Sequence, residues 1–453
     1  MPKIDLSRRQ FLTAAAALPV LSYPAFQQRA AAVADPWDET RAILARIKEP
    51  TFPKRDFDAK KYASLNQAIA ACSAAGGGRV VVPAGDFPTG PIRLKSKVNL
   101  YLSEGAVLKF STDPKAYLPV VFTRYEGTEF MNYSPFIYAF EEQDIAITGP
   151  GTLDGQADAS HWWDWTRNMG AARRRLVDFG ADGTPVTQRI FGEGSFMRPN
   201  FIQPYRSRNV LIDGVVIKNS PMWEINPVLC TNVIVRGVNI NSHGPNNDGC
   251  DPESCRDVLI ERCTFDTGDD CIALKSGRNN DGRRVGVPIE NVIVRDCTMK
   301  DGHGGVTIGS EISGGARNIF AERCKMDSPN LNIALRIKTN SVRGGVIEHV
   351  FMRDVTIGQV SQAVVTVDFL YEEGDAGKFP PVVRDVEVRN VTSQKSRNAL
   401  SLRGYAYTPV TNVRIRDCKF ENVAQADVLE NVKDVALTNV SVNGVTRSET
   451  ITK

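Results

Sequence analysis

The sequence contains no long hydrophobic run in its main body, no block of charge of one sign and no low-complexity tail. After the first thirty-odd of its 453 residues, no stretch approaches the roughly 18 consecutive apolar residues of a membrane-spanning helix. The 55 Lys and Arg residues are interspersed with 52 Asp and Glu residues, so no basic arm for nucleic acid is predicted. The 36 glycines and 25 prolines are scattered and form no linker. We expect one continuous monomeric domain without a membrane span or a nucleic-acid partner.

The N-terminus has the pattern of an export signal. The twin arginines Arg8 and Arg9 precede an apolar stretch at 13–21, and Ala32-Val33-Ala34 forms a small-x-small cleavage site. We predict a twin-arginine leader over residues 1–34, cleaved after Ala34, and a mature domain over 35–453. The mature protein is then expected to be soluble and periplasmic or secreted.

A short β-branched phrase recurs from residue 209 onward, at spacings of 22 to 36 residues. Each phrase is strand-like, because it is short, β-branched and bounded by turn residues. Repetition at this period indicates stacked units that are individually too small to bury their apolar face. The pattern predicts an all-β, single-stranded parallel β-helix. The phrases open at Asn209, Asn232, Asp257, Asn291, Asn318, His349, Asp385, Asn412 and Asp434.

The position six residues after each opening residue holds either valine or cysteine. A position that accepts both is expected to lie inside the solenoid, where cysteine acts as a small hydrophobic residue. This predicts that Cys263, Cys297, Cys324 and Cys418 are core residues and form neither disulfides nor metal ligands. Of the nine cysteines, Cys250 and Cys255 remain the pair for which a bridge is least excluded.

The segment before the repeats predicts a cap for the first coil. Residues Ser64 to Ala75 have an amphipathic helical pattern, ended by three glycines at 76–78 and followed by a strand at 79–83. Solenoids need a cover over their first coil. We expect this helix to provide it.

Four successive repeats each carry a polar cluster, at 246–248, 268–270, 302–304 and 336–338. Asp269 lies 12 residues after Asp257, and His303 lies 12 residues after Asn291. Equivalent positions on neighbouring coils should therefore stack, roughly 5 Å apart per coil. Alternation places Ile272, Val306, Leu335 and Val365 inward at equivalent positions. The positions expected to point outward are Ala273 and Lys275, Thr307 and Gly309, Arg336 and Lys338, and Thr366 and Asp368.

The clusters have the composition of an acid–base site for an acidic sugar. Crowded carboxylates repel one another, so one of them is expected to hold a proton, as glycoside hydrolysis requires. Arg336 and Lys338 suit a substrate carboxylate. Taken singly, each acidic cluster could be a turn, and Lys338 could form a surface pair with Asp368. Their occurrence together on consecutive coils favours the site.

These clusters, in this order, resemble the signature of the polygalacturonases, glycoside hydrolase family 28. The resemblance includes the whole segment from Cys297 to Ser310 and extends from about residue 55 to the end. It implies a right-handed solenoid of the pectin-lyase-like kind that cleaves α-1,4-galacturonide bonds with inversion and without a metal or cofactor. By that resemblance the general acid is Asp269, the activating pair is Asp248 with Asp270, His303 lies near the acid, and Asn246, Arg336 and Lys338 bind substrate.

Two departures accompany the resemblance. The first cluster reads Asn-Asn-Asp where many members have Asn-Thr-Asp. Fungal members usually bridge the cysteine after the double aspartate to one just before the histidine motif. Here Cys271 is present, but Cys297 falls in the repeated core position, so we do not predict that bridge.

A long insertion at 161–198 interrupts the repeats and contains Trp162, Trp163, Trp165 and three arginines at 173–175. Insertions in such folds often shape the substrate groove. The segment Tyr125-Glu126-Gly127 resembles that of bacterial exo-acting members. Together they favour trimming from a chain end, although the tryptophans are equally well explained as a cover for one edge.

Three other functions remain open. A hydrolase of rhamnogalacturonan shares the fold and similar motifs. A pectate lyase would use Asp248, Asp269 and Asp270 to bind calcium. A catalytically silent β-helix would bind carbohydrate along its groove.

Overall fold

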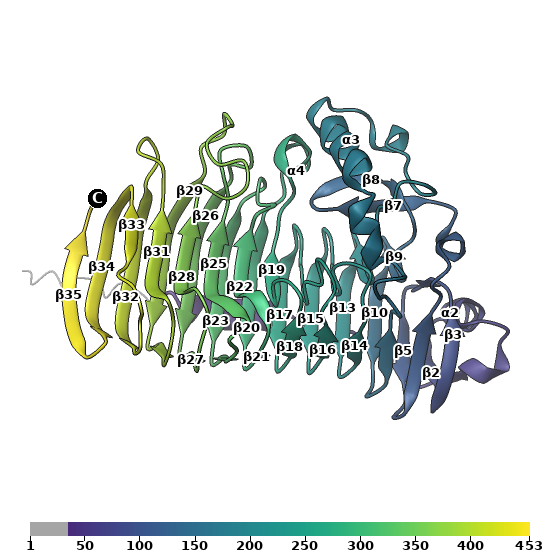
Figure 1. Cartoon of the computed structure of the whole chain (residues 1–453). Helices are drawn as coiled ribbons and strands as arrows, with labels where there is room; N and C mark the ends of the chain where they lie inside the picture. Colours follow the sequence, from purple (N-terminus) through teal and green to yellow (C-terminus); the bar gives the residue numbers. More distant parts are fainter. Residues whose placement is uncertain (1–34) are drawn as a thin grey trace, which may run out of the picture.

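The computed structural model describes residues 35–453, and the predicted leader lies outside the described residues. The chain winds into one elongated parallel β-helix, whose first coils lie at the right of Figure 1 and whose last coils lie at the left. The fold class expected from the repeats is confirmed. Among residues 35–453, no helix is long and apolar enough to cross a membrane.

Strands of successive coils pair in parallel and form three long faces. The first face contains β1 (Asp56–Asp58), β2 (Gly78–Val82), β5 (Val98–Leu102), β10 (Gln143–Thr148), β13 (Arg208–Asp213), β15 (Thr231–Arg236), β17 (Arg256–Glu261), β20 (Ile289–Arg295), β23 (Ala316–Glu322), β26 (Val346–Arg353), β29 (Val382–Arg389), β32 (Val410–Phe420) and β34 (Val432–Val442). The second contains β3 (Gly85–Thr89), β6 (Ala106–Phe110), β11 (Thr152–Asp154), β14 (Val216–Lys218), β16 (Asn239–Ser242), β18 (Thr264–Thr267), β21 (Thr298–Met299), β24 (Lys325–Met326), β27 (Thr356–Ile357) and β30 (Thr392–Ser393). The third contains β4 (Ile92–Arg93), β9 (Ile137–Phe140), β12 (Ile202–Tyr205), β19 (Ile272–Leu274), β22 (Gly302–Gly309), β25 (Leu331–Lys338), β28 (Ala363–Asp368), β31 (Asn398–Arg403) and β33 (Val428–Glu430). An antiparallel strand, β35 (Val445–Ile451), follows β34 at the C-terminal end.

The recurring phrases form the first face, in the register that the sequence predicts. Val210 pairs with Val233, and Val233 pairs with Val258. The residue that opens each phrase has a left-handed backbone, with φ between 52° and 59°. Asparagine and aspartate tolerate this conformation better than other non-glycine residues, which explains their recurrence. Their side chains also hydrogen-bond from coil to coil, as from Asn232 Nδ2 to Asn209 Oδ1 at 2.8 Å.

The interior of the solenoid is apolar and contains the cysteines. The four cysteines of the repeated position are buried, as predicted. All nine cysteines are buried and free, so the structure contains neither a Cys250–Cys255 nor a Cys271–Cys297 bridge. Core burial of a small apolar side chain is a sufficient reason for cysteine at these positions.

Helix α2 (Leu65–Ala74) covers the first coil, which confirms the predicted cap. Ser64 caps its N-terminus by accepting a hydrogen bond from the Gln67 amide at 3.3 Å. Leu65, Ala68 and Ile69 pack into the main core. Two short 3₁₀ helices, η1 (Ala59–Lys61) and η2 (Pro114–Tyr117), also belong to the N-terminal region.

The segment 35–47, which includes helix α1 (Asp38–Arg46), lies against the outside of the first face and was not predicted. Trp37, Ile43 and Ile47 cover a row of outward-facing apolar side chains, and Trp37 packs edge-on against Phe320 at 5.3 Å. The third residue of the recurring phrase is apolar as far as Phe351 and charged at Glu387. The run of apolar residues at this outward position was a sequence signal that the outer side of the first face is covered as far as Phe351. The covered row is Ala146, Leu211, Ile234, Leu259, Ile293, Phe320 and Phe351.

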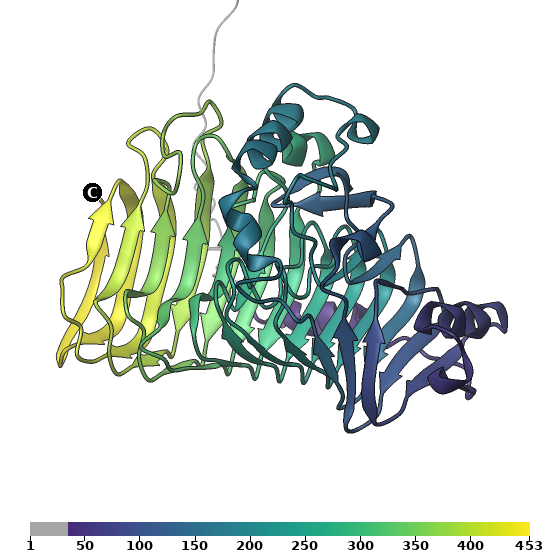
Figure 2. The same ribbon diagram turned by 45° about the vertical axis from the view of Figure 1, so that its right-hand side comes forward.

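A roof, which we define as residues 121–132, 161–198 and 279–285, projects from one side of the solenoid (Figures 1 and 2). The segment 125–127, which we compared with a coil of exo-acting members, is the tip of an antiparallel hairpin. Trp162 is buried against Tyr117 and Phe136, so this tryptophan covers the core. The elements of the roof are β7 (Val121–Tyr125), β8 (Thr128–Asn132), η3 (Trp163–Arg167), α3 (Gly170–Ala181), η4 (Val186–Gln188) and α4 (Asn279–Val285).

Candidate active site

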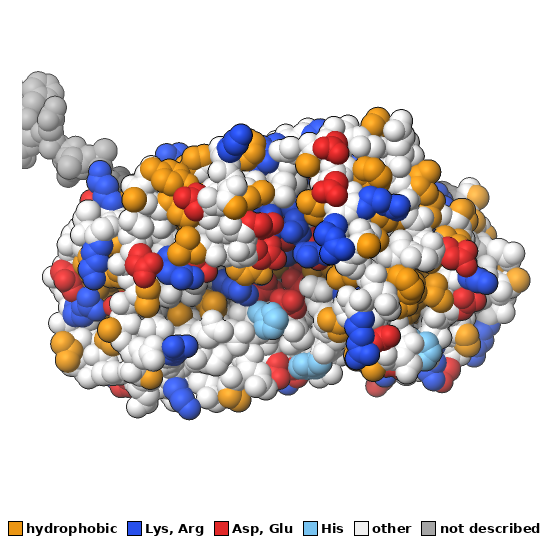
Figure 3. Space-filling model, turned by 45° about the horizontal axis from the view of Figure 1, so that its top comes forward, with side chains coloured by type: hydrophobic (Ala, Val, Ile, Leu, Met, Phe, Trp, Pro, Cys, Tyr) orange, Lys and Arg blue, Asp and Glu red, His pale blue; other side chains and the backbone are white. Residues whose placement is uncertain are grey.

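The predicted polar clusters meet on the outer side of the third face. Ile272 pairs with Val306, and Val306 pairs with Leu335, so the predicted register is confirmed. Thr307 and Arg336 are neighbours on adjacent strands and face outward. In Figure 3 acidic side chains and a histidine gather in a hollow of the surface, with Lys and Arg side chains around it.

Asp269 is the most accessible of the three predicted aspartates. Its side chain is 19% exposed, against 4% for Asp248 and 0% for Asp270. Its Oδ1 lies 2.9 Å from His303 Nδ1 and accepts a hydrogen bond from the Asp270 amide at 2.9 Å. The hydrogen bond to Asp269 raises the pKa of His303, whose imidazole therefore favours the protonated form beside this carboxylate.

Asp270 is fully buried but is held by cations. Its Oδ2 accepts a hydrogen bond from Lys338 Nζ at 2.8 Å, and its Oδ1 accepts from Thr307 Oγ1 at 3.0 Å and from Arg336 Nη1 at 3.3 Å. Burial alone would raise the pKa of Asp270, but Lys338 and Arg336 lower it to well below its usual range. Asp270 is therefore ionised. The alternative pairing of Lys338 with Asp368 is wrong, because Asp368 accepts from Arg403 at 2.8 Å.

Asp248 is nearly as buried but has few contacts. Its Oδ1 has no hydrogen-bond partner among residues 35–453, and Lys275 Nζ lies 3.8 Å from Oδ2. Burial raises the pKa of Asp248 well above its ordinary value, and the neighbouring charges of Asp251 and Asp269 add to the rise. In the free protein the shared proton is therefore best held by Asp248, whereas the resemblance assigns the role of acid to Asp269.

Asn246 and Asn247 hold the loop that carries Asp248. Asn246 Oδ1 accepts a hydrogen bond from Arg198 Nη2 at 2.7 Å, and the fully buried Arg198 also donates to the Pro245 carbonyl at 2.6 Å. Asn247 Oδ1 accepts from the Gly244 amide at 2.8 Å. The alternative interpretation of residues 246–248 as a turn is therefore partly correct. Arg198, at the end of the insertion, was not predicted as part of the site.

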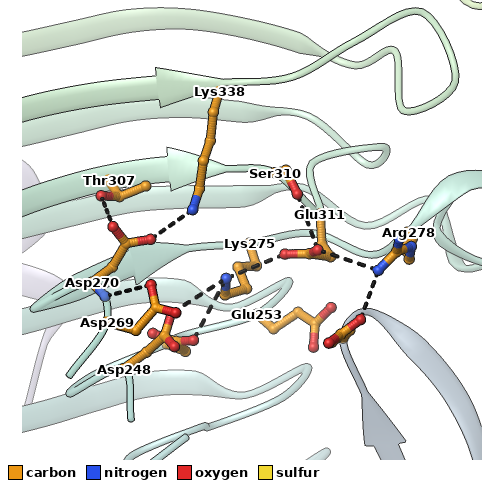
Figure 4. A network of polar contacts seen from close by, with 12 residues as sticks. Asp248, Glu253, Asp269, Asp270, Lys275, Arg278, Thr307, Ser310, Glu311 and Lys338 are labelled. Atoms are coloured by element: carbon orange, nitrogen blue, oxygen red, sulfur yellow. Dashed lines mark hydrogen bonds and ion pairs between the residues drawn. The ribbon is translucent and has the colours of Figure 1, made fainter. Parts of the chain in front are cut away.

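A second group of charged residues lies beside the aspartates and was missed (Figure 4). Lys275 was assigned to an outward position but is only 2% exposed, because Trp223, Asp251 and Glu311 enclose it. Its Nζ lies 3.2 Å from Glu311 Oε2 and 3.6 Å from Asp251 Oδ2. Arg278 in turn donates to Glu126 of the hairpin at 2.7 Å. Asp251 follows Asp248 by three residues, which was the only sequence signal for it.

Three groups of described residues have metal-like geometry. One oxygen from each of Asp248, Asp269 and Asp270 lies within 4.8 Å of the others. A cation there would compete with Lys338 and Arg336, which already contact both oxygens of Asp270. The other groups are His243, Asp266 and Asp301, and Glu348, His349 and Asp385.

The chain is similar to a family of glycosyl hydrolases and to several polygalacturonases. The model of the glycosyl hydrolases family 28 matches residues 191–443. An exopolygalacturonase structure from Thermotoga maritima is 42% identical, with a TM-score of 0.89 over 92% of this chain and 98% of that chain. A probable polygalacturonase of Vitis vinifera is 29% identical over 83% of this chain and 72% of its own length. An exo-poly-alpha-D-galacturonosidase of Dickeya chrysanthemi is 24% identical over 76% of this chain but 61% of its own length. The chain belongs to family 28 of the glycosyl hydrolases.

Proposed function

We propose that the protein is an exo-acting polygalacturonase that hydrolyses α-1,4-galacturonide bonds of pectic galacturonan. The observation that carries the proposal is the stacking of Asp248, Asp269 and Asp270 next to Arg336 and Lys338 on the third face. Carboxylates supply acid and base, and the two cations recognise a uronate. The polygalacturonase names of the similar proteins support the same substrate.

The cleft beside the aspartates suits an acidic chain. A cavity of about 380 Å³ begins at Arg336 and Lys338 and continues over the following coils to Arg397 and Arg403. Tyr371 lies at its edge, with Lys338 Nζ 5.2 Å from the ring centroid. A further uronate of the polymer can therefore meet cations on this side of the cleaved bond.

The environments of the aspartates support separate roles. We assign the acid to Asp269, because it is the most exposed of the three and contacts His303. Asp270 is a poor nucleophile, since both of its oxygens are engaged by Lys338, Arg336 and Thr307. Water held between Asp270 and Asp248 remains as the attacking group, which gives inversion. One oxygen from each of the three aspartates lies within 4.8 Å of the others, and the anomeric configuration of the first product tests inversion.

The roof supports attack at a chain end. The outward positions of the third face before the site, Gln203, Asn226 and Asp251, are fully buried. The hairpin covers this row, since Thr123 hydrogen-bonds to Gln203 and Arg124 lies 3.5 Å from Glu253. The equivalent residues after the site, Thr366 and Ser401, line the open cavity. A polymer can leave the site toward the C-terminal coils but not toward the N-terminal ones.

Export completes the proposal. A twin-arginine leader cleaved after Ala34 would place a monomeric enzyme in the periplasm or outside the cell, where pectic polymers or their fragments are found. N-terminal sequencing of the exported protein tests the cleavage site, and light scattering tests the monomer.

The decisive experiment is incubation of the purified mature protein with polygalacturonate in the presence of a chelator. Reducing ends without ultraviolet absorbance of unsaturated uronides are expected from a metal-independent hydrolase. Absorbance that disappears with chelator would favour a calcium-dependent lyase. Release of reducing ends only from rhamnogalacturonan would show that this polymer is the substrate. No release from either polymer would favour a binding protein.

A further inference from the structure

Lys275 is a buried cation surrounded by carboxylates at the edge of the site (Figure 4). It follows strand β19 and is 2% exposed. Its Nζ lies 3.8 Å from Asp248 Oδ2, 3.6 Å from Asp251 Oδ2 and 3.2 Å from Glu311 Oε2. The ring of Trp223 closes the remaining side, with its centroid 4.4 Å from Nζ. Desolvation makes each of these charge interactions stronger than it would be in water.

Asp248 has fewer stabilising contacts than Asp269 and Asp270, so its ionised form depends more on Lys275. Asp270 has Lys338, Arg336 and Thr307, and Asp269 has His303 and a backbone amide. Lys275 is the cation that the described residues place within 4 Å of Asp248. Without it, Asp248 would be a buried carboxylate among other carboxylates, which favours the neutral acid. The charged groups that face Asp248 are Asp251, Asp269, Asp270 and Lys275.

We propose that Lys275 is a positioning residue that stabilises the ionised, water-activating form of Asp248 relative to the neutral acid, and that Glu311 competes for the same lysine. The inference rests on the proposed function, in which Asp248 acts as a base. The lysine opposes the effect of burial, which favours the neutral acid, and so increases the fraction of Asp248 that can act as a base at a given pH.

The competing carboxylate is anchored away from Asp248. Glu311 Oε1 accepts a hydrogen bond from Ser310 Oγ at 3.1 Å and lies 3.7 Å from Arg278 Nη1. Arg278 is bound by Glu126 at the tip of the hairpin. The roof and Asp248 are therefore connected by four ion pairs in series, Glu126–Arg278, Arg278–Glu311, Glu311–Lys275 and Lys275–Asp248. The charged groups around Lys275 itself are Asp248, Asp251, Glu253, Asp270, Arg278, Glu311 and Lys338.

Two substitutions are expected to move the acidic limb of the pH–rate profile in opposite directions. Lys275→Met should raise the apparent pKa of the base by about one unit or more, which is a loss of roughly tenfold in kcat on that limb. Glu311→Gln should lower the same pKa, because the charge of Lys275 then interacts with Asp248 and Asp251 without competition from Glu311. Lys275→Arg retains the charge and should restore part of the Lys275→Met shift. The control is Lys109→Met, which removes an exposed lysine paired with Asp86 at 2.6 Å and should shift nothing.

A merely structural role predicts a different result. If Lys275→Met and Glu311→Gln both reduce kcat equally at every pH, with no displacement of the limb, the proposal is overturned. Glu311→Gln keeps the lysine in place, so it remains informative even if Lys275→Met does not fold. A downward shift for Lys275→Met, or an upward one for Glu311→Gln, would also contradict it.

A titration without substrate separates this proposal from the enzyme assignment. Carbon-13 NMR of aspartate carboxyls follows Asp248 directly, with Asp248→Asn identifying its resonance. The pKa of Asp248 should rise in Lys275→Met and fall in Glu311→Gln. If the wild-type protein released no reducing ends, the proposed function would fail while this titration still decided the role of Lys275. An unchanged Asp248 titration in both variants would overturn the inference alone.

Discussion

His303 Nδ1 lies 2.9 Å from Asp269 Oδ1, although the two residues are 34 positions apart in the chain. The contact exists because one coil of the solenoid separates them and both occupy the same position in their coils. The His303 amide also donates to the Asp269 carbonyl at 3.0 Å, so backbone pairing fixes the distance between the two side chains. Stacking of coils is therefore what brings the proposed acid, Asp269, next to His303.

Replacement of Asp269 by Asn is expected to reduce kcat by about 10²–10⁴-fold, because the amide has no proton of suitable acidity for the leaving oxygen. Binding of oligogalacturonides should persist, since Arg336 and Lys338 are untouched. Initial rates and equilibrium dialysis measure the two effects. Activity equal to wild type would falsify the assignment of Asp269 as the acid.

The two buried aspartates are expected to affect stability with opposite signs. The pKa of Asp270 is depressed in the folded protein, so its ion pairs stabilise the fold above the unfolded pKa of about 3.9, and this contribution is lost as pH falls through the folded pKa. Asp270→Asn should destabilise the protein at pH 7 by about 3–5 kcal/mol, because Lys338 is left buried without its partner.

The pKa of Asp248 is raised by burial, so this residue favours folding at low pH and opposes it as pH rises through the folded value. Asp248→Asn should therefore raise the free energy of unfolding at pH 7 while abolishing activity. Urea unfolding between pH 3 and 8 measures both variants. Equal destabilisation by the two substitutions at pH 7 would contradict the charge assignments.

Attack at a chain end should release only monomer or dimer from long polygalacturonate at early times. The reason is the roof, which buries Gln203 and Asn226 where the groove would otherwise continue. Chromatography of early products measures this, with an endo-acting enzyme as the control. A ladder of intermediate oligomers would show that the polymer passes through the site on both sides.

Inversion predicts that the first-formed sugar has the β configuration at its new reducing end. Both oxygens of Asp270 are engaged, and Asp248 is nearly inaccessible, so a covalent intermediate on either carboxylate is disfavoured. Proton NMR during the first minutes of hydrolysis detects the anomer before it equilibrates. Initial formation of the α anomer would indicate retention and a carboxylate nucleophile.

Trp37 should act on stability alone. Trp37→Ala would uncover the apolar row on the outside of the first face and is expected to lower the free energy of unfolding by about 3–5 kcal/mol. Activity per folded molecule should remain that of wild type, because this side of the solenoid does not carry the aspartates. Arg41→Ala in the same helix is the control, since its side chain is 80% exposed and its ion pair within residues 35–453 is with the neighbouring Asp38. Thermal melts and specific activity measure both, and a Trp37→Ala variant with an unchanged melting temperature would refute the role.

The local sequence pattern was sufficient to predict the coil and to predict which polar residues gather on its third face. The period of the phrase, the left-handed opening asparagines and the Val or Cys core position define one repeating unit. Because parallel coils stack in register, the common offset of Asp269 and His303 already placed them next to each other. The N-terminal cap was equally visible, since Ser64 and the three glycines mark both ends of the helix.

The sequence by itself determined the solenoid and which polar residues lie on its third face, because both depend on a repeat that can be recognised within short segments of the chain. Only the tertiary structure decided the protonation preferences and the shape of the groove. Lys275 was an outward residue by register, but Trp223, Asp251 and Glu311 on nearby coils enclose it. The roof, which closes one side of the groove, consists of non-repeating segments whose placement leaves no periodic trace in the sequence. The contacts of Trp37, Arg198 and Glu126 could not be predicted either, because they form where non-repeating segments pack against the solenoid.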